Sequence, residues 1–352
     1  MTREAPMIAV LRAAAAPRTA MVLMAAFAVF CLAGFLGARA DGGASAFFGS
    51  PVFLIAAAAA ALVLVYSLWL QARRLWALSL NPQASTGQLQ RYGAFFLHAG
   101  LLLLISAGLW AYAFEVRGFL QLMEGETFSG AESELLLVEK GRLAGSFKAP
   151  FRLTLERLAQ DYWANGEPRD FASLLRVEDD AGARPARLAF NSPLTLSGVS
   201  VFQSSHYGYS VTVGLKRPAG EEVFTHFLLD RPPVRGRPAV GGSDFPATAY
   251  QVDLSLKPDL GGGSFFLKDP AVEATVSESG AVVYKGPLPA GKSVRFSGGE
   301  LRLADLRYWS GISFSRGRAA WAAYLGFFLC VLGAALIYAR PRGPATEAAY
   351  GG

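Results

Sequence analysis

Hydrophobic residues along this chain follow two patterns: long apolar runs near both ends, and short alternating segments between them. Four of the runs have the length and apolarity of membrane-spanning helices. They cover Thr19–Gly37, Val52–Leu70, Tyr92–Phe114 and Ala319–Ala339. The pattern therefore predicts a membrane protein with four transmembrane α-helices, three N-terminal and one C-terminal.

The segment Glu115–Arg318, between the third and fourth runs, changes to short stretches in which apolar and polar residues alternate. Gly, Pro, Asn and Asp separate these stretches, as they separate strands. The segment is long enough for a hydrophobic core of its own, so we expect a large antiparallel all-β domain, sandwich-like or an open barrel. Clear alternation marks Phe151–Leu158, Ala186–Phe190, Val199–Phe202, Ser210–Leu215 and Gln251–Leu256.

Two hairpins are predicted near the end of this domain because short turn sequences lie between alternating segments. Ser277-Glu-Ser-Gly separates Val272–Val276 from Val282–Tyr284, and Ser297-Gly-Gly-Glu separates Val294–Phe296 from Leu301–Leu306. By contrast, the many Pro and Gly residues of Pro232–Pro246 favour a long loop. Gln71–Arg91, between the second and third spans, is expected to be a connector, with a short amphipathic piece as the alternative.

Composition and charge support a membrane protein and set its orientation. Hydrophobic residues make up 52% of the chain and charged residues 17%, which is below the quarter typical of soluble domains. The net charge of +6 does not come from Glu115–Arg318, which holds 24 basic and 24 acidic residues. The excess lies in arginines that flank the spans: Arg12, Arg18, Arg73, Arg74, Arg91, Arg340 and Arg342.

Positive residues near span ends mark the cytoplasmic side of a membrane. Both termini and the connector 71–91 are therefore expected inside, with the large domain extracytoplasmic. This placement of charge gives no support to nucleic-acid binding. Ala38-Arg39-Ala40 resembles a signal-peptidase site, but the preceding run is longer than a usual signal-peptide core, so we expect it to remain as a span.

Only two cysteines occur, Cys31 in the first span and Cys330 in the fourth. The predicted outer domain thus has neither a disulfide framework nor a thiol redox centre, and no C-x-x-C pair is present. Any thiol chemistry must belong to a partner.

His98 is the only residue in the apolar run Tyr92–Phe114 whose side chain can ionise near neutral pH. It lies six residues past Tyr92, about 9 Å along the helix, in the inner third of the bilayer. An ionisable group in hydrocarbon is a functional-site hypothesis, and a neutral imidazole is a common axial ligand of haem iron. The small neighbours Gly93, Ala94, Ala99 and Gly100 would let a flat group or another helix approach. A hydrogen bond between helices, with no ligand, is the alternative.

The other candidate sites are weaker. His206 and His226 have no further ligands at metal-site spacing, so a zinc site is not expected. No nucleophile-elbow pattern supports a Ser–His–Asp triad, and Gly261-Gly-Gly lacks the Lys-Ser/Thr of a phosphate loop. We therefore name no catalytic residue in this chain.

The sequence resembles the ResB family, the CcsB component of the System II cytochrome c maturation machinery, over most of its length. Three spans, a large outer domain and a last span are the layout of that family. The motifs that carry the resemblance are Gly93–Leu104 around His98, Gly118–Glu126, Asp170–Asp180, Asn191-Ser-Pro-Leu194 and Gly198–Ser205. One departure is Arg316-Gly317 before the last span, where a Pro-Gly pair is expected.

The resemblance implies an accessory, non-catalytic subunit of a cytochrome c synthase (haem lyase) complex in the bacterial plasma membrane. Such a subunit works with a CcsA-type membrane protein to move haem b across the membrane and attach it to apocytochrome c, with thiol-reducing proteins as further partners. His98 would be a haem iron ligand, and the partner would supply the second histidine. A competing hypothesis is a membrane-anchored β domain that binds peptides or scaffolds proteins without haem.

Overall fold

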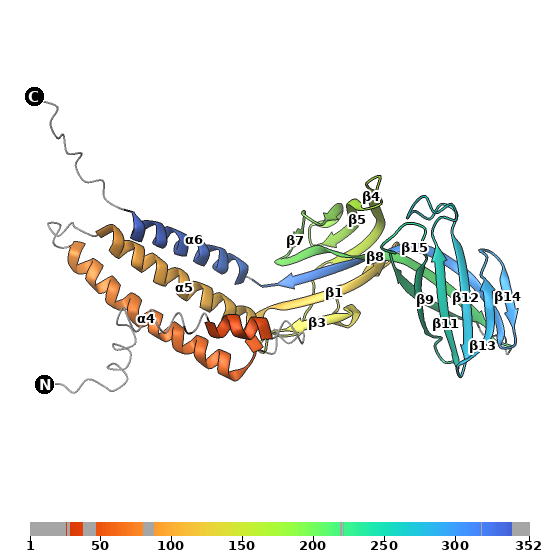
Figure 1. Cartoon of the computed structure of the whole chain (residues 1–352), viewed down its shortest axis with the longest axis horizontal. Coiled ribbons are helices and arrows are strands. Elements are labelled where there is room, and N and C mark those ends of the chain that lie inside the picture. Colours follow the sequence, from red (N-terminus) through yellow and green to blue (C-terminus); the bar gives the residue numbers. More distant parts are fainter. Residues whose placement is uncertain are drawn as a thin grey trace, which may run out of the picture. The chain divides into compact units, whose positions relative to one another are not determined.

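The structure, a computed structural model, describes residues 26, 29–37, 47–79, 88–218, 220, 222–317 and 319–339 (Figure 1). The chain divides into two compact units. The membrane unit contains the helices and the short segment Gly141–Ala144, and the β unit comprises Val116–Lys140 and Gly145–Arg316.

Three helices of the membrane unit are long and apolar enough to cross a membrane: α4 (Pro51–Ser79), α5 (Gln88–Phe114) and α6 (Ala319–Tyr338). They correspond to the second, third and fourth predicted spans. The first, Thr19–Gly37, is helical at residues 29–37 and otherwise lies mostly outside the described residues. The prediction of a membrane protein with an antiparallel β domain is confirmed.

Helix α4 begins at a well-formed cap and ends later than predicted. The Ser50 hydroxyl oxygen accepts a hydrogen bond from the Phe53 N–H at 3.2 Å, and Pro51 suits the first turn because it has no N–H to satisfy. The helix continues to Ser79, and α5 begins at Gln88. The prediction of a connector over Gln71–Arg91 is therefore wrong at both ends, because polar residues such as Gln and Arg end an apolar run without ending a helix.

Helices α5 and α6 pack antiparallel through small residues spaced seven apart. A methyl group added at Gly100 would lie 2.6 Å from the Gly326 carbonyl oxygen and 2.6 Å from the Cys330 Sγ atom. The two backbones are thus in direct contact, as in helix pairs built on small residues. The buried residues of this seam are Gly93, Gly100 and Ala107 on α5, and Ala319, Gly326 and Gly333 on α6.

The short segment Gly141–Ala144 caps the C-terminal end of α5. The Gly141 N–H donates to the Glu115 carbonyl at 2.8 Å, and the Leu143 N–H donates to the Ala113 carbonyl at 2.8 Å. Carbonyls at a helix end have no partner within the helix, so a returning segment can satisfy them.

The β unit contains fifteen described strands and one short helical turn, η1 (Glu132–Glu134). The strands are β1 (Val116–Met123), β2 (Thr127–Phe128), β3 (Leu137–Lys140), β4 (Arg152–Tyr162), β5 (Pro168–Asp179), β6 (Gly182–Ala189), β7 (Leu194–Leu196), β8 (Val199–Lys216), β9 (Glu222–Asp230), β10 (Ala239–Asp244), β11 (Tyr250–Lys257), β12 (Ala271–Glu278), β13 (Ala281–Pro287), β14 (Ser293–Phe296) and β15 (Gly299–Arg316).

These strands form three antiparallel sheets, and the long pair β8 and β15 belongs to the largest of them. The largest sheet has the order β3-β1-β15-β8-β7, with β14 beside β15 and β9 beside β8. The other two have the orders β2-β4-β5-β6 and β10-β11-β12-β13. In Figure 1, β8 and β15 run from the region of β4 and β5 to that of β9–β13. We call these regions the first lobe and the second lobe.

Strand β8 was predicted as two strands, Val199–Phe202 and Ser210–Leu215, and this division is wrong. A bulge explains the apparent break in the alternation: Ser204, Ser205 and His206 lie opposite the single residue Gly311 between two paired positions of β8 and β15. Extra residues in one strand bend it while the pairing resumes on either side. The prediction for β15, Leu301–Leu306, likewise covers only part of that strand.

Each lobe has its own apolar core. In the first lobe the buried ring of Phe314 packs against three other phenylalanines, Phe128, Phe147 and Phe151, with centroids 5.1, 6.1 and 6.5 Å away. In the second lobe the buried residues include Val211 and Val213 of β8 and Val252 and Leu254 of β11.

Both predicted hairpins are confirmed. Ser279 and Gly280 have φ values of 50° and 85° between β12 and β13, which is the geometry of a tight two-residue hairpin turn. The second hairpin joins β14 and β15, which pair from Phe296 and Gly299 outward. However, the predicted loop Pro232–Pro246 contains strand β10, an edge strand in which Gly and Ser leave little hydrophobic signal.

Candidate functional site

His98 lies on α5, half-buried, with one ring nitrogen engaged by its own helix. Its Nδ1 atom is 2.7 Å from the Ala94 carbonyl oxygen, one turn earlier. A carbonyl oxygen can only accept, so Nδ1 carries the proton and the lone pair is on Nε2 in the neutral ring. Such a bond fixes the ring and leaves the other nitrogen free to bind a metal. The interhelical hydrogen bond considered as an alternative is not present among the described residues.

The position of His98 on α5 separates it from the contact with α6. At about 100° per residue, His98 is rotated by roughly 140° from Gly93 on the helix circumference. Gly93 and Gly100 both pack against α6. Of the two possibilities raised by the sequence, these glycines therefore make room for another helix and not for a flat group beside the imidazole. His98 therefore faces away from α6, with Ala94, Leu101 and Leu102 as its nearest neighbours on the same face.

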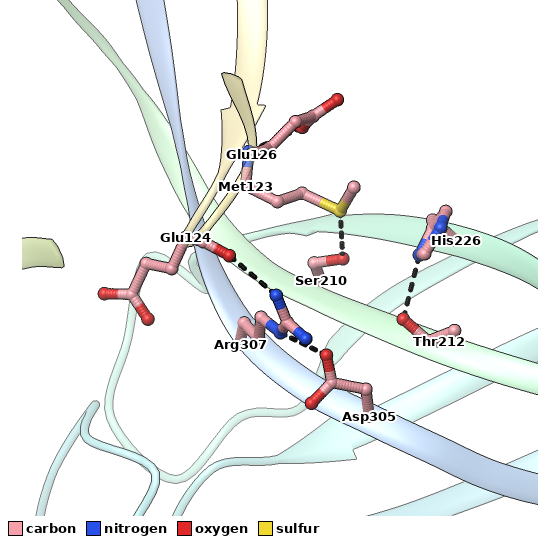
Figure 2. A network of polar contacts seen from close by, with 8 residues as sticks. All are labelled: Met123, Glu124, Glu126, Ser210, Thr212, His226, Asp305 and Arg307. Carbon is pink, nitrogen blue, oxygen red and sulfur yellow. Dashed lines mark hydrogen bonds and ion pairs between the residues drawn. The ribbon is translucent and has the colours of Figure 1, made fainter. Parts of the chain in front are cut away.

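The two remaining histidines lie in the β unit, and neither has a carboxylate partner among the described residues. His206, in the bulge of β8, has its Nδ1 atom 3.1 Å from the Ser204 hydroxyl, and its ring contacts that of Phe119 at 6.3 Å. Figure 2 shows His226 on β9 with its Nδ1 atom 2.8 Å from the Thr212 hydroxyl. In the same view Asp305 pairs with Arg307 and not with His226.

No hydrolytic or metal site is assembled from these residues. In the described part of the chain, no group of three or more His, Cys, Asp or Glu side chains could hold a metal ion. In this part of the chain, the hydroxyl–histidine pairs of the β unit have no carboxylate that would orient the imidazole as a base.

A polar cluster that the sequence analysis did not identify lies inside the first lobe. The Gln203 Oε1 atom accepts from the Ser173 hydroxyl at 2.7 Å, and its Nε2 atom donates to the Ser310 hydroxyl at 2.7 Å. A further bond of 2.9 Å joins the two serines, and all three residues are buried. The cluster thereby ties β5 to β8 and β15 beside the bulge. The sequence does indicate this cluster in one way: Gln203 occupies the next inward-facing position after Val199 and Val201, where an apolar residue would be expected.

The described surface of the β unit includes two hollows. One, with a volume of about 770 Å³, covers the outer face of β10–β13 and is lined by small or charged residues such as Gly241, Asp253 and Glu273. The other, of about 430 Å³, lies where β5, the turn after β6 and the bulge of β8 meet, and Phe171 and Phe190 line it.

The chain is thus a membrane protein that combines one intramembrane histidine with a two-lobed antiparallel β unit. The family model described as ResB-like family matches residues 79–342. The chain belongs to this family, and the resemblance seen in the sequence is confirmed.

Individual relatives agree with this assignment. The Cytochrome c biogenesis protein CcsB of Synechococcus sp. (strain CC9311) is 27% identical over 262 residues, which cover 72% of this chain and 53% of that protein. The protein of the same name from Thermosynechococcus vestitus (strain NIES-2133 / IAM M-273 / BP-1) is 26% identical over 281 residues, covering 75% and 56%. The chain spans about half the length of the relatives it matches.

A solved structure, Cytochrome c Heme Lyase CcmF, aligns with 92% of this chain and 35% of its own chain. Its sequence identity is 15% and its TM-score 0.33, a similarity too low to bear on fold or function.

Proposed function

We propose that this chain is an accessory subunit of a System II cytochrome c maturation complex. In this role it assists the passage of haem b across the membrane and its covalent attachment to apocytochrome c, together with a CcsA-type membrane protein. The family and the names of the relatives support this role. The attachment step is assigned to the complex because no catalytic constellation is found among the described residues of this chain.

His98 is the proposed ligand of the haem iron, and a histidine of the partner would be the second axial ligand. Two features of α5 support this role. Because the Nδ1–H group bonds to the Ala94 carbonyl, the lone pair of the neutral ring is on Nε2, and this nitrogen can coordinate haem iron. The rotation of His98 away from α6 keeps its imidazole out of the close contact between α5 and α6.

The proposed location is the bacterial plasma membrane, with both termini in the cytoplasm and the β unit outside. The arginines at the span ends support this orientation. The β unit is joined to the spanning helix α5 at its start and to α6 at its end. Haem taken up at His98, near the cytoplasmic side, would therefore leave on the outer side of the membrane, where the β unit lies. The two cysteines, Cys31 and Cys330, both belong to membrane segments, so separate thiol-reducing proteins would keep apocytochrome c reduced.

The free Nε2 atom of His98 is the observation that carries the proposal, and substitution of this residue tests it. We expect His98→Ala to lower the haem content of the complex copurified with its partner, and to remove the absorption bands of bis-imidazole haem. Added imidazole should restore part of both, because it can replace the missing ligand. The matched control is His206→Ala, which removes an exposed histidine of the β unit and should leave haem content unchanged.

Two results would contradict the proposal. An unchanged absorption spectrum in His98→Ala would exclude ligation by His98. A colourless wild-type complex would instead favour the competing hypothesis of a membrane-anchored β domain that binds peptides or scaffolds other proteins.

A further inference from the structure

The smaller hollow of the β unit is built from three segments distant in sequence. Phe171 comes from the start of β5, Phe190 from the turn after β6, and Ser205 from the bulge of β8. Its volume of about 430 Å³ is within the range of small-ligand pockets, roughly 300–1,000 Å³. Three of the four segments in which the outer domain resembles its family contribute residues to the lining: Asp170–Asp180, Asn191–Leu194 and Gly198–Ser205.

The aromatic side chains of the hollow lie on its wall and at its mouth. Phe171 stacks on the buried ring of Tyr207 with a centroid separation of 4.6 Å, which fixes its orientation. Phe190 is 62% exposed, a large fraction for a phenylalanine with no other ring against it among the described residues. Ala189, buried next to Phe190 in the chain, also lines the hollow. This part of the hollow can accept an apolar side chain.

Three polar side chains that line the hollow have no hydrogen bond in the described part of the chain: Asn191, Ser192 and Ser205. Only a few residues away, Gln203 and its two serines are fully bonded. One amide and two hydroxyls offer both donors and acceptors, and this combination matches the N–H and C=O groups of a peptide main chain.

The edge of β8 is open beside the hollow. Strand β7 pairs with β8 only as far as Val201, and β9 begins to pair at Gly208. Between these points Phe202, Gln203 and Tyr207 pair with β15 and Ser204–His206 form the bulge, while no strand of the described chain pairs with the opposite edge. Ser205 and His206, within this stretch, are exposed. An unpaired strand edge is a template for an extended segment of another chain.

Charge does not dominate the hollow. Arg187 pairs with Asp170 at 2.5 Å, and Arg169 pairs with Asp161 at 3.4 Å, so each cation already has a carboxylate partner. The lining also holds no histidine, since the ring of His206 lies against Phe119. These features disfavour a small anion and an iron-bearing macrocycle as the occupant.

We propose that this hollow binds an extended polypeptide segment of a partner protein. One apolar side chain of the segment packs between Phe171 and Phe190. The segment's main chain bonds to Asn191, Ser192 and Ser205 and lies along the open edge of β8. This site is independent of the haem proposal, because it uses neither His98 nor any other residue of the membrane unit.

Selection from a random peptide library tests the site without assuming a sequence. The full chain, reconstituted in lipid nanodiscs, is used to select phage-displayed dodecapeptides. We expect enriched peptides to share an apolar residue in an extended, β-compatible context. Their affinity should fall at least about tenfold for Phe190→Ser, as for a central anchor of an interface. Phe224→Ser is the matched control because it removes an exposed phenylalanine of β9, and it should leave binding unchanged.

A synthetic copy of the best peptide then separates main-chain from side-chain recognition. Methylation of the amide nitrogens beside the anchor should weaken binding about fivefold or more, since it removes hydrogen-bond donors. His98→Ala should leave peptide binding unchanged even if it abolishes haem binding.

Three results would overturn the proposal: no enrichment, enrichment that survives Phe190→Ser, or binding insensitive to amide methylation. Binding of free protoporphyrin that Phe190→Ser abolishes, without peptide selection, would assign the hollow to a flat macrocycle instead. Phe190 is largely exposed, so the variant is expected to fold, and its thermal unfolding provides the check.

Discussion

The membrane unit and the β unit pack by opposite means. Helices α5 and α6 meet where side chains are missing, at Gly93, Gly100, Gly326 and Gly333. The β unit is filled by large side chains, among them Trp309 and Phe314, both almost fully buried. In contrast, large apolar residues of α6 such as Trp321 and Phe328 are mostly exposed, at 78% and 62%.

The difference follows from the solvent that each unit is built for. In water, removal of apolar surface drives packing, so the largest side chains are buried. In lipid that drive is absent between helices, and close contact of the backbones has to hold them together. The same residue type is therefore placed differently in the two units: phenylalanine is buried in the core of the β unit and exposed towards lipid in the membrane unit.

Polar groups divide in the same way. The β unit buries a glutamine and two serines in a closed cluster, where every group has a partner. The membrane unit contains one histidine in its central apolar stretch, and only its Nδ1 atom has a hydrogen-bond partner among the described residues. A closed cluster indicates a structural role, whereas a free donor in an apolar segment indicates a binding role.

The largest expected effect concerns the closed cluster. Gln203→Ala removes the residue that joins Ser173 and Ser310, and it should lower the stability of the β unit by about 3 kcal/mol, because buried hydroxyls lose partners and a cavity forms. Thermal unfolding of the full chain, followed by near-UV circular dichroism, measures the loss. Gln251→Ala on the exposed side of β11 is the control and should change little. Equal midpoints for the two variants would show that the cluster is not structural.

A smaller effect is expected from filling the helix contact. Gly100→Leu adds atoms where a methyl group would already lie 2.6 Å from the Gly326 carbonyl oxygen, and should cost about 2 kcal/mol. Hydrogen exchange of α6 amides in detergent should become faster. Gly108→Leu lies on the same helix with no atom within 4 Å of the added carbon, and should leave exchange unaffected. Similar exchange in both variants would argue against the glycine contact.

The smallest effect is a dependence on pH in the first lobe. The hydrogen bond from Lys140 and the N–H of Phe147, 2.6 Å from its carboxylate, lower the pKa of Glu132. A lowered pKa in the folded state gives stability that is complete above the ordinary value of about 4.3 and is lost as the pH falls through the lower folded value.

Glu132→Gln should therefore unfold at a lower temperature than the wild type at pH 7, with the difference shrinking as the pH falls below about 4. Glu156→Gln, at an exposed position of β4, is the matched control. A difference that stays constant with pH would mean that the carboxylate charge has no part in stability.

Local patterns in the sequence determined much of this molecule. Long apolar runs predicted α4, α5 and α6, because a helix in lipid is apolar on all sides. Alternation predicted the antiparallel β unit with its two hairpins, because a strand in water has one buried and one exposed face. His98 was identified in the same way, as a single ionisable residue in an apolar run. The family followed from motifs that are contiguous in the chain.

Only the tertiary structure decided which residues meet. The bulge that keeps β8 continuous, the strand β10 within a Pro- and Gly-rich stretch, and the seam of α5 with α6 all depend on a partner element distant in sequence. The free side of the His98 ring and the hollow between Phe171 and Phe190 belong to the same class. Such features arise from pairing and close approach across the fold, and no local pattern of hydrophobicity records them.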